Sequence, residues 1–317
     1  MCALRIGIVG KRGAAHAAGF RAHPHAEVSA LCEVDPVALE REGVALGVDR
    51  RFTTIESMLD HVDAVFVATP MHLHASQALI ALQAGKHVLS EVTACVSLDE
   101  CQALREAVRS SGLTYTMAEN YLFFEENVIV REMARKGLFG KPYFGEGEYV
   151  HDVKPYHHFP DGRPTWRTQW QVGARGNTYP THSLGPVVSW FEAAGESARP
   201  ESVVCWGSGV HTDPEHPHDD TTETLVRLSG GGLVRLRLDM MSNRPPEEAF
   251  YGLQGTHGVF ESGRGRHGGG QVWVGENPPP GPVKEERREW RPVRDFADLV
   301  PPPLRDLQRQ AQGAGHG

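Results

Sequence analysis

The sequence lacks three features that would place it at once in a membrane, nucleic-acid-binding or disulfide-rich class. No apolar run reaches the roughly 20 residues that span a membrane, and the start of the chain has no secretory pattern. The formal net charge is -8 without a basic block, which argues against nucleic acid or an anionic membrane as a partner. The five cysteines are scattered, odd in number and without C-x-x-C spacing, which indicates a reducing cytoplasm.

What is present is enough chain for two domains, 317 residues with 40% hydrophobic content. In the first third, short apolar runs alternate with helical patterns, which is typical of a parallel sheet covered by helices. Strands are predicted at 3–9, 27–32, 62–69, 87–89 and 114–118, and helices near 14–22, 36–46, 72–84 and 97–110. The pattern predicts an α/β dinucleotide-binding domain over residues 1–120, a Rossmann fold with a doubly wound parallel sheet.

The rest of the chain has consecutive strand patterns. Helices are predicted near 124–136 and at 181–192, and strands at 141–150, 201–209, 221–228, 233–240 and 249–255. The glycine-rich turn at 229–232 predicts a hairpin between two of these strands. We therefore predict a second, α+β domain over residues 121–317, with a largely antiparallel open sheet. Residues 263–303 are rich in Gly, Pro and Arg and are predicted to be irregular loops.

A glycine turn separates the first predicted strand from the first helix. Gly10 and Gly13 allow a tight turn and let backbone N–H groups approach a pyrophosphate at the helix start. Arg12 occupies the middle glycine place of the G-x-G-x-x-G pattern, and Ala15 the third. Such a turn is also compatible with a simple loop, so the assignment depends on its context.

The context is an acidic residue after the second strand. Glu33 stands where a carboxylate accepts hydrogen bonds from a ribose diol and disfavours the 2′-phosphate of NADP. We expect NAD rather than NADP, although Arg12 with Arg50 or Arg51 could offset that repulsion, and a solvated loop acid is the simpler alternative for Glu33. The cofactor contacts predicted here are Gly10, Lys11, Arg12, Gly13 and Glu33.

More specific motifs lie between residues 62 and 91. They are Ala68-Thr69-Pro70, His74, the run Ala84-Gly85-Lys86-His87-Val88, and Glu91. These motifs resemble those of the Gfo/Idh/MocA family of NAD(P)-dependent sugar oxidoreductases, and the resemblance covers at least residues 1–260. It implies that the following residues lie near the cofactor: Thr69, Pro70, His72, His74, Glu91 and Asn120.

Two features of that family are missing. Val92 stands in the place of the usual lysine, and Thr178, four residues before His182, stands where an Asp-x-x-x-His pair would have its aspartate. The family's relay of the hydroxyl proton through lysine and histidine therefore cannot operate. The loss of lysine is interpreted as a change of base rather than as a dead site.

Other motifs resemble one branch of the family, the NAD-dependent α-N-acetylgalactosaminidase-like glycosidases. They are Glu91-Val92, Asn120-Tyr121, Trp166-Arg167 and the run GNTYPTHSLGP at 176–186. The resemblance implies Glu91, Tyr121, Tyr179 and His182 as catalytic residues, and Trp166, Arg167 and Tyr251 as substrate contacts. Structural roles are the alternative for the aromatic residues and His182, and His72 and His74 could face solvent at a helix start.

The main hypothesis is an NAD-dependent oxidoreductase that moves a hydride between a sugar hydroxyl carbon and the cofactor. The alternatives are a redox-neutral glycosidase that works through a C3-keto intermediate, and a non-catalytic NAD-binding regulator. By analogy a homo-oligomer, a dimer or tetramer, is expected. No metal site is predicted, because the group His211, His216, His218, Asp219 and Asp220 matches no zinc spacing. The chain ends where related sequences continue, so a C-terminally truncated fragment is also expected.

Overall fold

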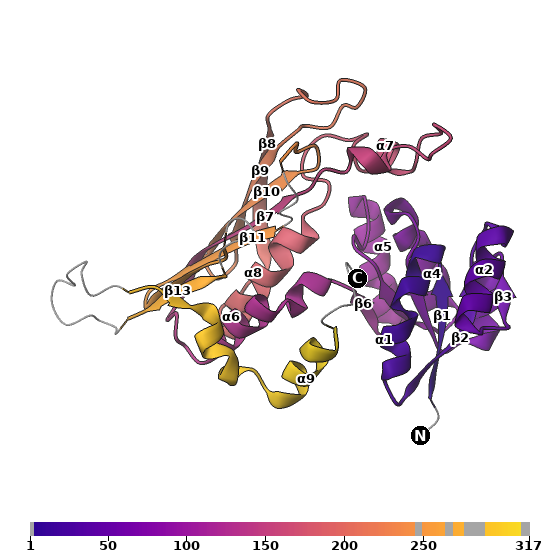
Figure 1. Cartoon of the computed structure of the whole chain (residues 1–317), viewed down its shortest axis with the longest axis horizontal. Coiled ribbons are helices and arrows are strands. Elements are labelled where there is room, and N and C mark those ends of the chain that lie inside the picture. Colours follow the sequence, from indigo (N-terminus) through magenta and orange to yellow (C-terminus); the bar gives the residue numbers. More distant parts are fainter. Residues whose placement is uncertain (1–2, 245–248, 264–268, 276–288, 312–317) are drawn as a thin grey trace. The chain divides into compact units, whose positions relative to one another are not determined.

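A computed structural model describes residues 3–244, 249–263, 269–275 and 289–311 of the chain, with side chains up to residue 306 (Figure 1). The chain divides into two compact units, Met1–Glu119 and Asn120–Gly315. None of the helices in the described ranges is long and apolar enough to cross a membrane. Each unit is described by itself.

The first unit contains a six-stranded parallel sheet in the order β3-β2-β1-β4-β5-β6. Its strands are β1 (Leu4–Val9), β2 (Ala26–Cys32), β3 (Arg51–Phe52), β4 (Ala64–Val67), β5 (His87–Ser90) and β6 (Tyr115–Met117). The strand order reverses at β1 and β4, which defines a doubly wound Rossmann sheet and confirms the predicted fold class. Ligands of such sheets bind beyond the carboxyl ends of the strands, near that reversal.

Helices alternate with the strands of this sheet. They are η1 (Lys11–His16), α1 (Ala17–Ala22), α2 (Pro36–Leu46), α3 (Ile55–Met58), η2 (Leu59–His61), η3 (Met71–Leu73), α4 (His74–Gln83) and α5 (Leu98–Ser111). The helix α2 begins at a proline after Asp35, whose carboxylate accepts from Val37 N, and ends at Gly47 in the left-handed conformation. The short elements β3 and α3 were not predicted, because they are too brief to show a period.

The second unit contains an eight-stranded sheet in the order β14-β13-β12-β11-β7-β10-β9-β8. Its strands are β7 (Pro142–Val150), β8 (Pro200–Gly207), β9 (Thr222–Leu228), β10 (Leu233–Asp239), β11 (Ala249–Gly255), β12 (Gly258–Glu261), β13 (Gln271–Val274) and β14 (Arg291–Pro292). The β7–β10 pair is parallel and the other neighbours are antiparallel, so the predicted mostly antiparallel sheet is confirmed. The hairpin around 229–232 is confirmed as β9–β10.

The prediction of irregular loops over 263–303 is wrong for the described residues in that range. There β13 pairs with β12, β14 pairs with β13, and residues Val293–Leu299 form a 3-10 helix, η7. Each strand is too short to produce a readable alternation of its own. The hydrogen bonds that define β13 come from its pairing with β12, which depends on the tertiary fold.

Helices pack on one face of this sheet, and charged side chains cover the other. The helical elements are η4 (Asn120–Phe123), α6 (Glu125–Arg135), η5 (Lys154–Tyr156), α7 (Arg167–Trp170), α8 (Thr181–Ala193), η7 and α9 (Pro302–Ala311). A Cβ atom on Gly147 would lie 2.2 Å from Ser183 O, and one on Gly145 would lie 2.4 Å from Val187 Cγ1. The absence of these side chains lets α8 lie close against β7.

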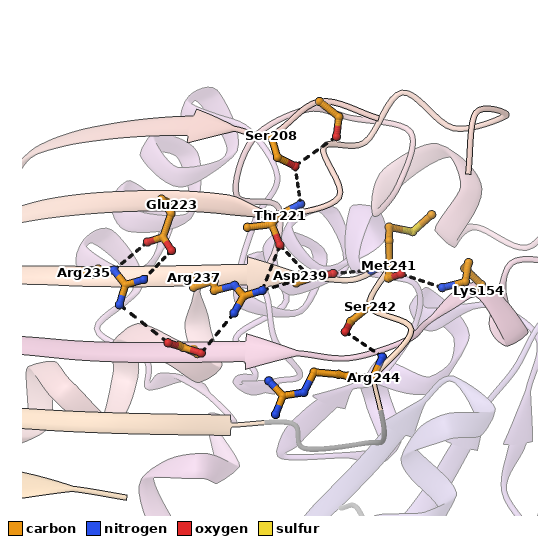
Figure 2. A network of polar contacts seen from close by, with 12 residues as sticks. Lys154, Ser208, Thr221, Glu223, Arg235, Arg237, Asp239, Met241, Ser242 and Arg244 are labelled. Carbon is orange, nitrogen blue, oxygen red and sulfur yellow. Dashed lines mark hydrogen bonds and ion pairs between the residues drawn. The ribbon is translucent and has the colours of Figure 1, made fainter. Parts of the chain in front are cut away.

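Along each strand, side chains on the opposite face alternate with those that face α8, since successive residues of a strand point to opposite sides. Figure 2 shows its ion pairs: Arg235 lies 2.6 Å from Glu223, and Arg237 lies 3.5 Å from Asp239. A further ion pair joins Arg235 to Glu146 at 3.2 Å. The central strands β7, β9 and β10 therefore carry charged side chains on the face that is turned away from α8.

Candidate active site

The turn between β1 and η1 requires glycine. Gly10 has φ +95°, and a Cβ atom there would lie 2.5 Å from Ala68 O, at the end of the neighbouring strand β4. Gly13 is equally constrained, because its Cβ would lie 2.5 Å from Ile8 Cγ2. The backbone of this turn can therefore approach a ligand closely. Arg12, in the middle glycine position, is exposed and does not obstruct the turn.

Glu33 lies beside this turn. Its Oε2 accepts from Lys11 N at 2.7 Å and its Oε1 accepts from Asp35 N at 3.1 Å, so two backbone amides orient the carboxylate. Gly10, Lys11 and Glu33 line one small pocket with the apolar side chains of Ile8 and Leu39. A glycine turn, an oriented carboxylate and an apolar wall fit the adenosine end of a dinucleotide.

Two of the three arginines considered for a 2′-phosphate, Arg50 and Arg51, differ in their surroundings. Arg50 is exposed. The guanidinium of Arg51 donates to Val48 O at 2.8 Å and to Glu40 Oε2 at 2.7 Å, so it is held against α2. Selection of NAD over NADP by Glu33 stays a prediction.

His74 holds together two loops at the carboxyl end of the sheet. Its side chain is 1% exposed, with Nδ1 at 2.7 Å from Thr93 O and Nε2 at 2.8 Å from Thr69 O. Which of the two nitrogens donates depends on the tautomer of the ring. Thr69 in turn donates its hydroxyl to Gln77 Oε1 at 2.7 Å. His74 is therefore not solvent-facing, and it positions Thr69; direct contact with a cofactor stays a prediction.

The remaining predicted cofactor contacts lie at the starts of helices. Pro70 precedes η3, and His72 lies within η3. Burial, followed by the nearby His74, lowers the pKa of His72. Asn120 begins η4, at the start of the second unit.

Glu91 follows β5 and is paired with a histidine that the sequence did not single out. His16 Nε2, at the end of η1, lies 3.0 Å from Glu91 Oε1. Burial raises the pKa of Glu91, but the adjacent imidazole and the charges of Arg12 and His74 outweigh it and hold the net pKa below its ordinary value. The carboxylate is thus ionised at neutral pH. Val92, beside it, is 7% exposed and offers no proton.

In the second unit, three of the predicted catalytic residues form an aromatic cluster. The rings of Tyr121 and His182 stack with centroids 4.1 Å apart and planes 12° apart, and the Tyr179 ring meets His182 edge-on at 5.1 Å. Tyr149, on β7, lies 5.2 Å from His182 and 5.7 Å from Tyr179. The cluster brings three phenols and one imidazole together, groups that can exchange protons with a hydroxyl.

Tyr149 was missed by sequence reasoning, although a signal was present. It continues the alternation of Gly145 and Gly147, whose side of β7 packs against α8. His182 lies in the first turn of α8, and that close packing brings the two rings together.

Tyr251 supports the cluster from β11. Its side chain is 3% exposed, and its hydroxyl donates to His182 O at 2.5 Å. The bond holds the first turn of α8. A contact between Tyr251 and substrate stays a prediction, as the hydroxyl already has this partner.

Arg167 begins α7 and lies among aromatic rings. Its guanidinium carbon is 4.6 Å from the Trp166 ring centroid and 5.8 Å from that of Tyr156, and its Nη1 donates to Gln171 Oε1 at 2.6 Å. Stacking and the hydrogen bond orient a planar fork that can bind hydroxyls or a carboxylate.

Comparison with known proteins gives the class of each unit. Residues 4–119 match the oxidoreductase family with an NAD-binding Rossmann fold. Residues 123–317 match the C-terminal domain of glycosyl hydrolase 109. The first unit is therefore an NAD-binding Rossmann domain of the oxidoreductase family, which confirms the family resemblance and the predicted cofactor.

Individual relatives agree with these matches. A glycosyl hydrolase family 109 protein of Saccharopolyspora erythraea is 31% identical over 297 residues, covering 81% of this chain and 62% of that protein. One from Shewanella pealeana is 28% identical over 289 residues, covering 82% and 63%. The chain belongs to the glycosyl hydrolase 109 family, since the C-terminal match spans more than half of it. It spans about three fifths of the length of these relatives.

Solved structures with the same fold are more distant in sequence. Levoglucosan dehydrogenase in complex with NADH and L-sorbose superimposes with a TM-score of 0.75 at 22% identity, covering 92% of this chain and 79% of that one. An NAD-binding oxidoreductase from Klebsiella pneumoniae has a TM-score of 0.74 at 22% identity, covering 91% and 78%. These likenesses show the fold alone.

Proposed function

We propose that this chain carries out NAD-dependent hydride transfer at a hydroxyl-bearing carbon of a sugar or sugar derivative. The observation that carries the proposal is the glycine turn at Gly10 beside the oriented carboxylate of Glu33, in a domain that matches an NAD-binding oxidoreductase family. When bound, NAD supplies the hydride acceptor. The protein has to bind the cofactor, orient the sugar and move one proton.

Cofactor binding is assigned to the first unit. Gly10 and Gly13 allow the pyrophosphate to approach backbone amides, and Glu33 accepts from the adenosine ribose diol. Thr69 is positioned through His74 at the end of the next strand. Glu91 lies near the nicotinamide in this proposal, where an ionised carboxylate favours the positive charge of the oxidised ring.

Proton transfer is assigned to the aromatic cluster of the second unit. Oxidation of a secondary alcohol removes a hydride from carbon and a proton from oxygen, and the proton needs a base. Tyr179 and His182 are candidates, with Tyr121 stacked on the imidazole. Arg167, beside Trp166, orients the sugar through its planar donors.

A second candidate function is redox-neutral glycoside cleavage. Two observations favour it: the match to the glycosyl hydrolase 109 C-terminal domain, and the buried Val92 in place of a lysine base. Oxidation at C3 makes the C2 hydrogen acidic, so a base can remove it while the C1 substituent leaves. Water then adds at C1, a proton returns to C2, and the hydride returns to C3.

Assembly and location complete the proposal. The edge strand β8 is exposed along its whole length and carries the exposed side chains of Val203, Val204 and Trp206. An apolar, unpaired strand edge favours pairing with a second copy, which supports a homo-oligomer. The described cysteines are free thiols, which supports a cytoplasmic location.

The test is a reaction in deuterated water with a panel of free sugars and 4-nitrophenyl glycosides. If the reaction is a net oxidation, NADH should accumulate in step with product. The absorbance of NADH measures this. Redox-neutral cleavage predicts release of 4-nitrophenol without NADH and deuterium at C2 by NMR. Tight NAD binding with neither product would favour a non-catalytic regulator and contradict both proposals.

A further inference from the structure

A group of metal-ligating side chains lies away from the Tyr–His cluster in the second unit. It consists of His157, after η5, and Asp213 and His216, in the loop between β8 and β9. One ligand atom from each residue lies within 4.8 Å of the others. His157 Nδ1 is 3.7 Å and His216 Nε2 is 3.8 Å from the same oxygen, Asp213 Oδ2.

We propose that His157, Asp213 and His216 bind a divalent transition-metal ion of the Zn²⁺ class. The ion would join the segment that leads to Trp166 with the loop between β8 and β9.

The distances suit an ion better than hydrogen bonds. A nitrogen 3.7 or 3.8 Å from an oxygen is beyond hydrogen-bond reach. Ligands of a tetrahedral zinc ion, each about 2.0–2.2 Å from the metal, are about 3.3–3.5 Å from one another. Closing the two nitrogen–oxygen distances takes a few tenths of an ångström each. The ligand atoms of the two imidazoles, within 4.8 Å of each other, must also approach by up to about 1.5 Å to form the site.

Unsatisfied nitrogen atoms support the same conclusion. His157 is 2% exposed and the His216 side chain 11% exposed. Within the described residues, Nε2 of each ring is buried without a hydrogen-bond partner. For His216 this is the nitrogen that faces Asp213 Oδ2, whereas His157 turns its Nδ1 towards that oxygen.

The backbone holds all three ligands in place. Asp213 Oδ1 accepts from Glu215 N at 3.2 Å, which turns Oδ2 towards the imidazoles. A turn in which His216 N donates to Asp213 O at 3.3 Å puts both side chains on one side of the loop. His157 is anchored at both backbone atoms, since its N donates to Lys154 O and its O accepts from Thr165 N.

Neighbouring acidic and histidine residues make other hydrogen bonds. Asp219 accepts from Gly176 N and Gly209 N, and Asp220 accepts from His211 N and Thr212 N. Nδ1 of the His218 ring lies 2.9 Å from the backbone oxygen of residue 174. These residues shape the loop, and the three proposed ligands remain directed at one another.

The donor set selects the type of ion. Two imidazoles and one carboxylate are nitrogen and oxygen donors that suit Zn²⁺, whereas Mg²⁺ and Ca²⁺ prefer oxygen donors. Three protein ligands leave a fourth position for water. His157 follows Tyr156, whose ring centroid lies 5.8 Å from the guanidinium carbon of Arg167, so metal binding would hold the region of the predicted sugar anchor in place.

The experiment uses the full chain without a histidine tag, stripped with EDTA and titrated with Zn²⁺ alone by calorimetry. We expect one ion per chain with a dissociation constant of about a micromolar or below, and Co²⁺ should give the visible absorption of a tetrahedral site. Asp213→Asn keeps the Oδ1 acceptor and removes the charge, and should weaken binding by at least about tenfold. His216→Ala should weaken it at least as much.

His211→Ala is the matched control. It lies in the same loop, it is exposed, and its Nε2 contacts Ser208 O rather than the three ligands. Zn²⁺ should bind this variant as it binds the original chain. Circular dichroism checks that each variant is folded, and Zn²⁺ should raise the melting temperature of the original chain but not that of Asp213→Asn. No binding at millimolar Zn²⁺, or equal binding by all variants, would overturn the proposal.

Discussion

In the first unit, the predicted cofactor residues follow neighbouring parallel strands: Gly10 after β1, Glu33 after β2 and Glu91 after β5. In the second unit, Tyr121, Tyr149 and His182 come from η4, β7 and α8, which are distant in sequence. The carboxyl ends of parallel strands meet at one edge, so short-range spacing suffices in the first unit. The second arrangement depends on how closely α8 packs on β7. Substitutions in each unit can distinguish these two kinds of construction.

The largest effect is expected for Gly10→Val. The side chain would meet Ala68 O and would need φ +95°, which an L residue rarely adopts. We expect NAD affinity to fall by at least about a hundredfold, measured by calorimetry. Gly47→Ala is the control: it has φ +61° but open space, so it should cost about 1 kcal/mol of stability and leave NAD affinity unchanged. Unchanged affinity in Gly10→Val would mean that the cofactor does not approach this turn.

The next effect is expected for His182→Ala. It removes the ring stacked on Tyr121, and the turnover rate should fall by about a hundredfold or more if the imidazole is an acid–base group. NAD affinity, measured separately, should not change. Tyr251→Phe is the control, since it removes the hydrogen bond to His182 O and should cost about 1 kcal/mol. Full turnover in folded His182→Ala would leave the histidine with a structural role.

A smaller effect is expected for Glu33→Ala. Loss of the carboxylate removes hydrogen bonds to the ribose diol and should weaken NAD binding by about ten- to a hundredfold. The preference for NAD over NADP should shrink as well. Glu42→Ala, in the same pocket but paired with Arg41, should bind NAD normally. Calorimetry with both nucleotides measures all of these values, and equal NAD affinity in Glu33→Ala would refute the assignment.

The smallest change in activity is expected for Val92→Lys. Val92 is 7% exposed, so a lysine there would bury a charge without the aspartate–histidine partner of related enzymes. We expect no gain in NADH formation on the sugar panel. Val92→Met, an uncharged replacement of similar length, separates the effect of charge from that of size. A clear gain from lysine alone would mean that the site is a decayed dehydrogenase.

The sequence was informative where a function depends on neighbouring residues. Gly10, Gly13 and Glu33 were found from strand boundaries and turn chemistry, and the structure puts them at one pocket or directly beside it. His16 was not found, because its pairing with Glu91 joins the end of η1 to the end of β5. No local period predicts which side of a short 3-10 helix faces a neighbouring strand.

The histidine-rich loop shows the same limit. Its sequence favoured no metal site, and most of its polar residues do bond to the loop itself. The ligand set proposed above combines only Asp213 and His216 from the loop with His157, which lies far earlier in the chain. Spacing within the loop could not reveal that third residue.

The sequence by itself determined the alternation of strands and helices, the glycine turn and the acid after β2, because hydrophobic period and turn chemistry act over a few residues. It also determined that a lysine base is absent, since Val92 is part of the chain. The tertiary structure decided which distant side chains meet. Gly145 and Gly147 let α8 approach β7 and bring His182 to Tyr149, because helix–sheet contact depends on steric fit across the whole unit.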